Sequence, residues 1–235
     1  MRASPCTSYA AYRIVAVATV VSPAFEGEID VQFKVLTIAR EYGSGGAEIA
    51  GIIAHELGWK LIDKALIAEI CNKARVPTEE GSEMDERIDP WLHRITRSLW
   101  GKSPDGFSTP VPVELFDAAV AAALARRVIE EAYAIGNCVI VGRGSQCILR
   151  NREDVFHAFV YAQWANRVHR IQMRQTKVVD VAALIHSVDE QRLEYVRLNY
   201  GENQADSHLY DLTINSKKRT DTVARLIRSA MEMSW

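Results

Sequence analysis

The segment REYGSGGAE, residues 40–48, combines residue types whose spacing suggests phosphate binding. It follows the apolar run 35–39, which we expect to be a buried strand, and it precedes apolar residues at helical spacing. Glycines in such a turn let backbone N–H groups point inward, and the N-terminus of the following helix adds unpaired donors and partial positive charge. We interpret residues 43–46 as a phosphate-binding loop, with a merely flexible turn as the alternative.

Two further strand ends carry residues suited to binding phosphate. Asp63 ends the predicted strand 59–63, and Arg143 follows the apolar strand 138–142 within the motif VGRG. An arginine fixed at a strand end can bind phosphate through two hydrogen bonds, but a salt bridge to a neighbouring acid would explain it equally well. Because ligands of parallel sheets bind at the carboxyl ends of the strands, we expect both residues on the same edge as residues 43–46.

A third group of charged side chains lies nearer the C-terminus. The arginines between residues 167 and 197 are Arg167, Arg170, Arg174, Arg192 and Arg197. On solvated helices such side chains usually form only a polar face, which is the reading that the residues alone favour. On a mobile segment above a phosphate site, the same arginines would neutralise charge in the transition state and exclude water.

The elements that must position these residues alternate along the chain. We expect strands at residues 35–39, 59–63, 138–142, 157–162 and 211–215, and helices at residues 47–57, 64–74, 114–135, 166–176, 189–198 and 220–233. The strands are nearly continuous apolar runs, as in parallel sheets that are covered on both faces. The sequence therefore predicts an α/β fold with a three-layer parallel sheet of about five strands and helices on both faces.

Two regions fall outside this alternation, so we place the domain at residues 32–235. We expect residues 1–31 to be a disordered extension or an over-long translation start, with a weak signal peptide as the alternative. The apolar run 14–21 within them is too short to span a bilayer. Between residues 76 and 113, repeated prolines and glycines indicate an insertion around an amphipathic stretch at residues 89–100.

The composition argues against several functions. A formal net charge of −2 disfavours a protein that coats nucleic acid or an anionic membrane. Four cysteines without a C-x-x-C pair indicate thiols in a reducing compartment, so we expect a cytoplasmic protein. His55 and Glu56 begin the metalloprotease pattern H-E-x-x-H, but Trp59 takes the place of the second histidine. We therefore expect no metal site built by the protein alone.

The order of these motifs resembles that of the cytidylate kinase-like family, a divergent branch of the P-loop nucleoside monophosphate kinases. The resemblance rests on LTIAREYGSGGAEIAGIIAHELGWKLIDKALI, NCVIVGRGSQCIL, FHAFVYAQWANRVHRIQMR, DEQRLEYVRLNYG and YDLTIN, within residues 35–227. It implies transfer of the terminal phosphoryl group of ATP, with Mg²⁺, to CMP or dCMP. It also implies an acceptor-binding segment at residues 76–113 and an arginine-bearing lid at about residues 167–200.

The resemblance also assigns roles to individual residues. The positions that match the donor-phosphate loop are Gly43, Ser44, Gly45 and Gly46. Asp63 matches an acid near the acceptor site, and Arg143 matches the arginine that holds the acceptor phosphate. The arginines that match lid positions, in approximate register, are Arg170 or Arg174 together with Arg192 and Arg197.

The chain departs from the cytidylate kinases at three positions. Gly46 stands where a lysine bridges two phosphates of ATP, Glu48 where a hydroxyl holds Mg²⁺, and Gly144 where an acid follows the arginine. Loss of one such electrostatic contact typically costs on the order of 10²- to 10³-fold in rate. Arg40 is close enough in sequence to replace the lysine as a cation. Glu48 either binds Mg²⁺ or stabilises the start of the helix.

Three interpretations remain after these departures. The leading one is a nucleoside monophosphate kinase for CMP or dCMP whose partners are nucleotide substrates, and the sequence indicates no particular oligomeric state. A nucleotide-binding protein with a sensing or scaffold role is the second, and the missing lysine favours it. The third is a kinase for another small phosphorylated substrate, because base recognition would come from residues 65–116.

Overall fold

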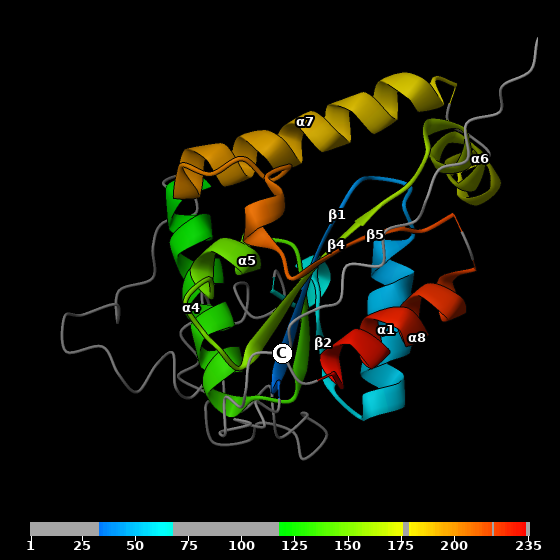
Figure 1. Ribbon diagram of the computed structural model, residues 1–235. Coiled ribbons are helices and arrows are strands. Elements are labelled where there is room, and N and C mark those ends of the chain that lie inside the picture. The colour runs from blue at the N-terminus through cyan, green and yellow to red at the C-terminus, as the bar shows by residue number, and fades with distance from the viewer. Residues whose placement is uncertain (1–32, 68–117, 176–178, 218, 234–235) are drawn as a thin grey trace, which may run out of the picture. The chain divides into compact units, whose positions relative to one another are not determined.

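The computed structural model describes residues 33–67, 118–175, 179–217 and 219–233. Within them the chain forms a five-stranded sheet with only parallel pairings, in the order β2–β3–β1–β4–β5 (Figure 1). The strands are β1 (Val35–Arg40), β2 (Lys60–Ile62), β3 (Cys138–Val141), β4 (Val155–Tyr161) and β5 (Leu212–Asn215). The predicted α/β fold with a parallel sheet of about five strands is therefore confirmed.

Helices cover both faces of this sheet and complete the three layers (Figure 1). On one face lie α4 (Ala118–Ile135) and α5 (Ser145–Ile148), and on the other lie α1 (Gly46–Leu57) and α8 (Thr220–Met231). The other described helices are α6 (Trp164–Arg174), α7 (Val181–Tyr200) and a short 3₁₀ helix, η2 (Ser207–Leu209). Successive side chains of a strand point to opposite faces. Accordingly, Val35 packs in the core under α4, whereas Leu36 and Ile38 pack in the core under α1 and α8.

Helices α6 and α7 form a separate small core with the segment that follows β1. Ile171 of α6 packs with Val181 and Ile185 of α7, and all three side chains are buried. Tyr42, in the turn between β1 and α1, packs against the same cluster. The glycine-rich turn is therefore attached to α6 and α7 by apolar contact as well as by the polar contacts described below.

Several element boundaries differ from those that the periodicity predicts. Helix α7 begins at Val181 rather than at residue 189, because Asp180 caps it by accepting a hydrogen bond from the Ala183 N–H at 2.9 Å. Strand β4 begins at Val155 rather than at residue 157, and the short helix α5 was not predicted. The expected insertion at 76–113, the extension at 1–31 and most of the helix at 64–74 lie outside the described residues.

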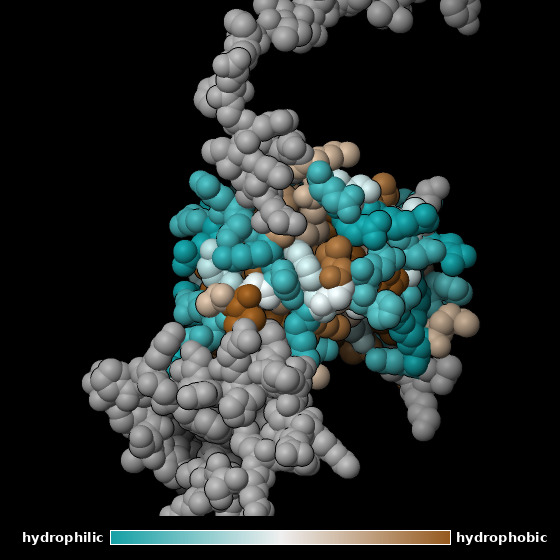
Figure 2. Space-filling model, turned by 90° about the horizontal axis from the view of Figure 1, so that it is seen from below, coloured by the Kyte–Doolittle hydropathy of each residue, from teal (hydrophilic) through white to brown (hydrophobic). Residues whose placement is uncertain are grey.

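The exterior of the described part is largely polar. Figure 2 shows a face on which hydrophilic residues predominate and hydrophobic ones form small separate spots. None of the described helices combines the length and apolar character that a membrane crossing requires.

Candidate functional site

The turn between β1 and α1 has the geometry of an anion-binding loop. Gly45 has a left-handed backbone with φ of 85° and caps α1, which begins at Gly46 without a hydrogen bond from any capping side chain. Ser44 closes the turn by donating from its N–H (3.3 Å) and its hydroxyl (2.9 Å) to the Glu41 carbonyl. The first N–H groups of α1 are thus without a capping side chain, which suits a phosphate at this helix N-terminus.

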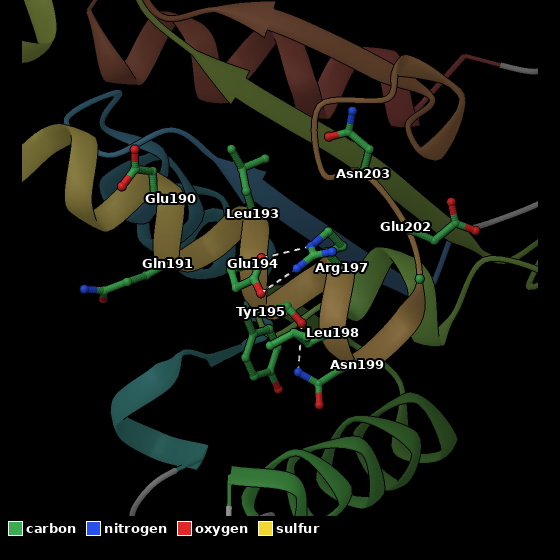
Figure 3. A pocket seen from close by; sticks show the side chains of 11 residues that line it. Glu190, Gln191, Leu193, Glu194, Tyr195, Arg197, Leu198, Asn199, Glu202 and Asn203 are labelled. Carbon is green, nitrogen blue, oxygen red and sulfur yellow. Dashed lines mark hydrogen bonds and ion pairs between the residues drawn. The ribbon is translucent and has the colours of Figure 1, made fainter.

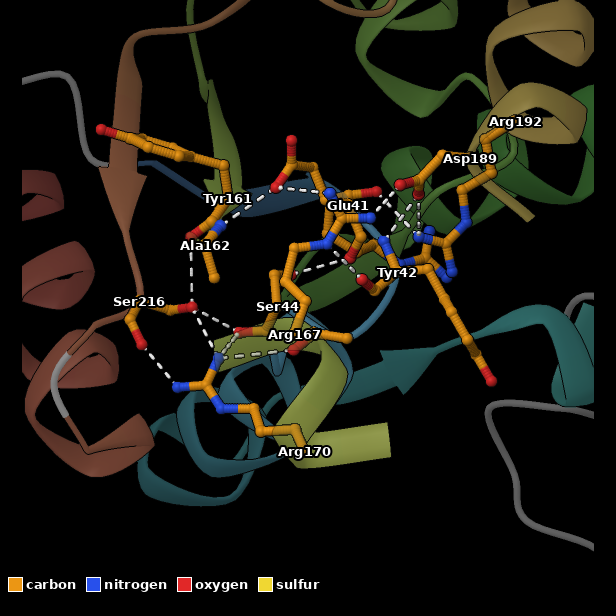
Figure 4. Close-up of polar contacts among 12 residues, drawn as sticks. Glu41, Tyr42, Ser44, Tyr161, Ala162, Arg167, Arg170, Asp189, Arg192 and Ser216 are labelled. Carbon is orange, nitrogen blue, oxygen red and sulfur yellow. Dashed lines mark hydrogen bonds and ion pairs between the residues drawn. The ribbon is translucent and has the colours of Figure 1, made fainter. Parts of the chain in front are cut away.

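Arg167 holds this turn from α6 and is almost completely buried, with 8% of its side chain exposed. Its Nε donates to the Tyr42 carbonyl at 2.7 Å, and its guanidinium forms ion pairs with Asp189 and, at 3.4 Å, with Glu41 (Figure 4). Asp189 also accepts a hydrogen bond from the Tyr42 N–H at 2.7 Å. The guanidinium is therefore engaged by the protein itself, and it joins the turn to α6 and α7.

Arg170 is engaged in the same way, one helical turn further along α6. Its Nη1 donates to the Ser44 carbonyl at 2.8 Å and to the Ser216 hydroxyl at 3.0 Å, and its Nη2 donates to the Ser216 carbonyl at 2.5 Å (Figure 4). Burial lowers the pKa of this guanidinium, an effect that nearby Glu48 opposes. Arg170 therefore fixes the turn against the end of β5, and its donors point at protein carbonyls.

Glu48, the residue at the predicted Mg²⁺ position, already has two partners. Arg174 forms an ion pair with its carboxylate, and the Thr220 hydroxyl donates to it at 2.8 Å. In the part of the chain that the structure describes, no cluster of three or more His, Cys, Asp or Glu side chains is arranged to hold a metal ion. As described, Glu48 is a surface link between α1, α6 and α8, and its geometry does not fit a Mg²⁺ ligand.

Arg40 extends from the end of β1 toward β3 rather than along the glycine turn. A Cβ added at Gly46 would lie 2.8 Å from the Arg40 Cβ, and one added at Gly142 would lie 2.0 Å from its Nη1. The stem of Arg40 therefore fills the space beside Gly46, and its guanidinium lies against Gly142. This contact explains physically why residue 46 is a glycine where related loops carry lysine.

Burial and charge make Arg40 an unusual arginine. Desolvation lowers its pKa to about 9, and the positive charges of Arg192 and Arg143 act in the same direction, whereas Asp63 opposes them. Arg192 lies on α7 and donates from Nη1 to the Arg40 carbonyl at 2.9 Å. Asp63 caps the helical turn that starts at residue 64 by accepting from the Leu66 N–H at 2.9 Å. The predicted Asp63 is thus close to the site while it also serves as a helix cap.

Arg143 lies at the carboxyl end of β3 in a left-handed conformation that is uncommon for a residue other than glycine, with φ of 58°. The Tyr200 hydroxyl donates to its carbonyl at 3.1 Å, and the Tyr195 ring lies 5.7 Å from the centre of its guanidinium. The Arg143 Nε is buried and has no hydrogen-bond partner among the described residues. Such backbone strain, of order 1–3 kcal/mol, persists where the surroundings enforce it and often marks a functional site.

Gly144 lacks the acid of cytidylate kinases for a steric reason. A Cβ at this position would lie 2.0 Å from the Tyr200 ring, and its φ of 69° is left-handed as well. The aromatic side chain at the end of α7 therefore occupies the volume that an aspartate would need.

Arg197, the last of the predicted lid arginines, lies apart from the turn. Its side chain is 67% exposed and forms an ion pair with Glu194 of the same helix at 2.8 Å. It lines a pocket along α7 and the turn that follows, together with Tyr195 and Glu202 (Figure 3). The structure thus brings Arg167, Arg170, Arg174 and Arg192 to the turn and its surroundings but leaves Arg197 on the solvated face.

Among the residues that shape the site, Ser216 and Tyr200, like Asp189, were not predicted from the sequence. The Ser216 hydroxyl, at the end of β5, donates to the Ser44 carbonyl at 2.5 Å, and Tyr200 packs on the turn after β3. Ser216 is 172 residues from Ser44 along the chain, and Tyr200 is 57 residues from Arg143. No local pattern relates residues so far apart, so only the fold could reveal these contacts.

Comparison with known proteins identifies the family. The sequence of residues 35–218 matches the cytidylate kinase-like family. The chain belongs to this family. The match covers the glycine turn and VGRG of this cytidylate kinase-like chain, and it confirms the resemblance that its motifs suggested. No curated protein matches the sequence.

A solved structure shares the fold of this cytidylate kinase-like protein. An uncharacterized protein from Eubacterium ventriosum is 20% identical and superposes with a TM-score of 0.59, over 84% of this chain and 98% of that one. Shikimate kinase from Bacteroides thetaiotaomicron is 14% identical, with a TM-score of 0.47 over 85% of this chain and 98% of that one. At 20% identity, the first of them shows a shared fold alone.

Proposed function

We propose that this protein transfers the terminal phosphoryl group of ATP to a small phosphorylated acceptor, with CMP and dCMP as the first candidates. Membership of the cytidylate kinase-like family supports the class of reaction. The observation that carries the proposal is Arg143, which is held in a strained conformation with a buried Nε that no described residue satisfies. A phosphate oxygen would provide the missing acceptor for this donor.

The donor side fits the phosphates of ATP through the backbone. The uncapped start of α1 after Gly45 offers N–H groups and the positive end of the helix dipole. Residues 43–46 would hold the phosphates of ATP at this helix N-terminus, and ATP would supply the phosphoryl group that is transferred. Arg167 and Arg170 keep the turn in place, so that little reorganisation is needed on binding.

The Mg²⁺ that normally accompanies ATP would have few protein ligands here. Glu48 is occupied by Arg174 and Thr220, and the Ser44 hydroxyl donates to Glu41. These contacts do not fit direct coordination by the chain, so we assign no step to the ion and expect it to be held by phosphate oxygens and water.

A second candidate function is nucleotide binding without turnover, as in a sensor or scaffold. This function is favoured by the hydrogen bonds of Arg167 and Arg170 to protein groups. Because of these bonds, neither guanidinium is free to neutralise the charge that develops on the transferred phosphoryl group. A kinase for another phosphorylated small molecule is the third candidate, since residues that would select a base lie outside the described ones.

The first test is ADP release from Mg²⁺ and ATP by the full chain, with CMP, dCMP, UMP and AMP offered separately. We expect turnover with CMP or dCMP and a loss of about 10²- to 10³-fold in kcat/KM for Arg143→Ala. Arg228→Ala is the matched control, because Arg228 pairs with Glu56 between α8 and α1 at 3.0 Å. ATP binding without turnover for any acceptor would favour the sensor, and turnover that survives Arg143→Ala would contradict the assigned acceptor site.

A further inference from the structure

The turn after β3 has three consecutive residues with a left-handed backbone. The φ angles of Gly142, Arg143 and Gly144 are 74°, 58° and 69°. Residues with a side chain rarely adopt this conformation, because their Cβ then crowds the following carbonyl oxygen. Glycine avoids this crowding on either side of Arg143, but Arg143 itself does not. Contacts from other parts of the chain must therefore hold Arg143 in place.

The carbonyl groups of this turn show where one such contact comes from. The Gly142 carbonyl accepts a hydrogen bond from the Ser145 N–H at 3.1 Å, and the Gly144 carbonyl accepts from N–H groups of α5 at 2.9 and 3.0 Å. The Arg143 carbonyl between them instead accepts from the Tyr200 hydroxyl at 3.1 Å. A side chain at the end of α7 thus satisfies the carbonyl of the strained residue.

The ring of Tyr200 restrains the same turn by its volume. A Cβ added at Gly144 would lie 2.0 Å from the ring, so the ring fills the space beside this glycine. The Arg126 guanidinium on α4 lies 5.3 Å from the centre of the Tyr200 ring, and the Tyr195 ring lies 6.3 Å away with its edge toward it. Burial raises the pKa of the Tyr200 hydroxyl, which therefore stays protonated and remains a donor at neutral pH.

Helix α7 attaches Tyr200 to the glycine-rich turn. Asp189 of α7 accepts a hydrogen bond from the Tyr42 N–H at 2.7 Å, and Tyr200 is the last residue of the same helix. At a rise of about 1.5 Å per residue, Asp189 and Tyr200 are about 16 Å apart along the helix axis. Just after Tyr200, Glu202 forms an ion pair at 2.5 Å with Arg150, which follows α5. One helix is therefore fixed both at the glycine-rich turn and beside the turn after β3.

We propose that Tyr200 is a positioning residue, which acts by holding Arg143 in the conformation that binds the acceptor. This role rests on the proposed function, because it reaches the substrate only through Arg143. The hydroxyl of Tyr200 fixes the Arg143 carbonyl, and its ring fixes Gly144. The buried Arg143 Nε is then directed before the substrate arrives, and little reorganisation is needed on binding.

The test compares Tyr200→Phe and Tyr200→Ala with the wild-type chain by calorimetry with CMP, cytidine and ATP. Tyr200→Phe keeps the ring and loses the bond to the Arg143 carbonyl, so we expect CMP affinity to fall about 3- to 10-fold. Tyr200→Ala also empties the space beside Gly144, and we expect a loss of about 10- to 100-fold. Cytidine, which lacks the phosphate, and ATP should bind both variants within about twofold of the wild type. In turnover, the KM for CMP should rise and the KM for ATP should not.

A double-mutant cycle separates positioning from a general effect on the fold. If Tyr200 acts through Arg143, Tyr200→Phe should change CMP affinity by less than about twofold once Arg143→Ala is present. Tyr133→Phe is the matched control, because the Tyr133 hydroxyl donates to Asp154 at 2.9 Å, just before β4 at the opposite edge of the sheet. This control also loses a tyrosine hydrogen bond, and its CMP affinity should not change.

Each other outcome decides against the positioning role or against the reaction separately. An undiminished effect of Tyr200→Phe in the Arg143→Ala background would overturn the role, because Tyr200 would then support the fold or contact the substrate itself. Equal losses for CMP and cytidine, or unchanged CMP affinity in Tyr200→Phe and Tyr200→Ala, would overturn it as well. If the wild type binds CMP without turnover, a phosphate-dependent loss that vanishes in Arg143→Ala upholds the role while the proposed reaction fails. If the wild type binds neither CMP nor inorganic phosphate, the role and the proposed acceptor are both wrong. Tyr200→Phe, alone and with Arg143→Ala, decides the matter if Tyr200→Ala does not fold.

Discussion

The two halves of the phosphate edge differ in what their arginines contact. On the donor side, Arg167 and Arg170 are hydrogen-bonded to backbone carbonyls or ion-paired with carboxylates of the protein. On the acceptor side, the Nε of Arg143 is buried and has no hydrogen-bond partner among the residues described. The number of arginines near a loop is therefore a poor guide to its affinity for phosphate, because only unengaged donors can bind a ligand without first breaking a protein contact.

The difference also separates two physical roles for one residue type. A paired arginine stabilises the fold, and its removal should appear first in unfolding experiments. An unpaired, half-buried arginine destabilises the free protein, and its removal should appear first in ligand affinity. Three arginine substitutions test this division and one glycine substitution tests the packing beside Arg143, given from the largest expected effect to the smallest.

Arg167→Met should cause the largest loss of stability. The substitution leaves the carboxylates of Asp189 and Glu41 without their shared cation and removes the bond to the Tyr42 carbonyl. Breaking a buried pair in this way typically costs about 3–5 kcal/mol. Urea unfolding measures the loss, with Arg228→Met as the surface control, which should change by less than about 1 kcal/mol. A loss below about 1 kcal/mol for Arg167→Met would mean that the turn is not held by this network.

Gly144→Asp, which restores the acid of the cytidylate kinases, should cost about 2–4 kcal/mol from backbone strain and the clash with Tyr200. Gly58→Asp is a close control, because Gly58 has a similar φ of 64° with no atom within 4 Å of an added Cβ. The difference between the two variants in thermal unfolding isolates the contact with Tyr200. Equal losses of stability in Gly144→Asp and Gly58→Asp would show that Tyr200 moves away easily. In that case, adding Tyr200→Ala should not restore the stability of Gly144→Asp.

Arg170→Met should distinguish the two substrates. It removes the donors to the Ser44 and Ser216 carbonyls, which costs about 1–3 kcal/mol, and loosens the turn rather than the acceptor edge. We expect weaker binding of ATP, by about 10-fold, and unchanged binding of CMP, both measured by calorimetry. A loss confined to CMP would contradict the division between the two halves and would place Arg170 in the acceptor site.

Arg197→Ala should have the smallest effect. Its exposed ion pair with Glu194 contributes little, so the free energy of unfolding should change by less than about 1 kcal/mol. Turnover and nucleotide affinity should stay within twofold of the wild type. A 10-fold loss of turnover would show instead that α7 brings Arg197 to the phosphates during the reaction, as the resemblance to the family implies.

Local patterns in the sequence were sufficient to predict the strands and the glycine-rich turn of this molecule. Apolar runs predicted the strands, because a strand covered on both faces must be apolar along its length. The glycines after β1 predicted the turn, because Gly45 adopts a conformation that other residues disfavour. The strand ends at Asp63 and Arg143 followed from the rule that parallel strands present their carboxyl ends at one edge.

The state of each arginine could not be predicted in the same way. Arg170 and Ser44, whose carbonyl it contacts, are 126 residues apart in the chain. Thr220, whose hydroxyl donates to the Glu48 carboxylate, is 172 residues from Glu48. Whether a guanidinium is engaged or available depends on such tertiary contacts, and no spacing rule encodes them. The sequence therefore indicated which residues gather at the edge and gave no means to rank them as ligands.

The packing of Arg40 also constrains how this loop could change during evolution. Because its stem lies against Gly46, a mutation to lysine at residue 46 would place a Cβ 2.8 Å from that of Arg40. Replacing Arg40 first would instead produce an intermediate with neither Arg40 nor a lysine beside the turn. Each order of substitution passes through a poorer protein, so the two residues should change together among descendants of this chain. We expect glycine at position 46 wherever Arg40 is retained, because the two positions should covary in evolution.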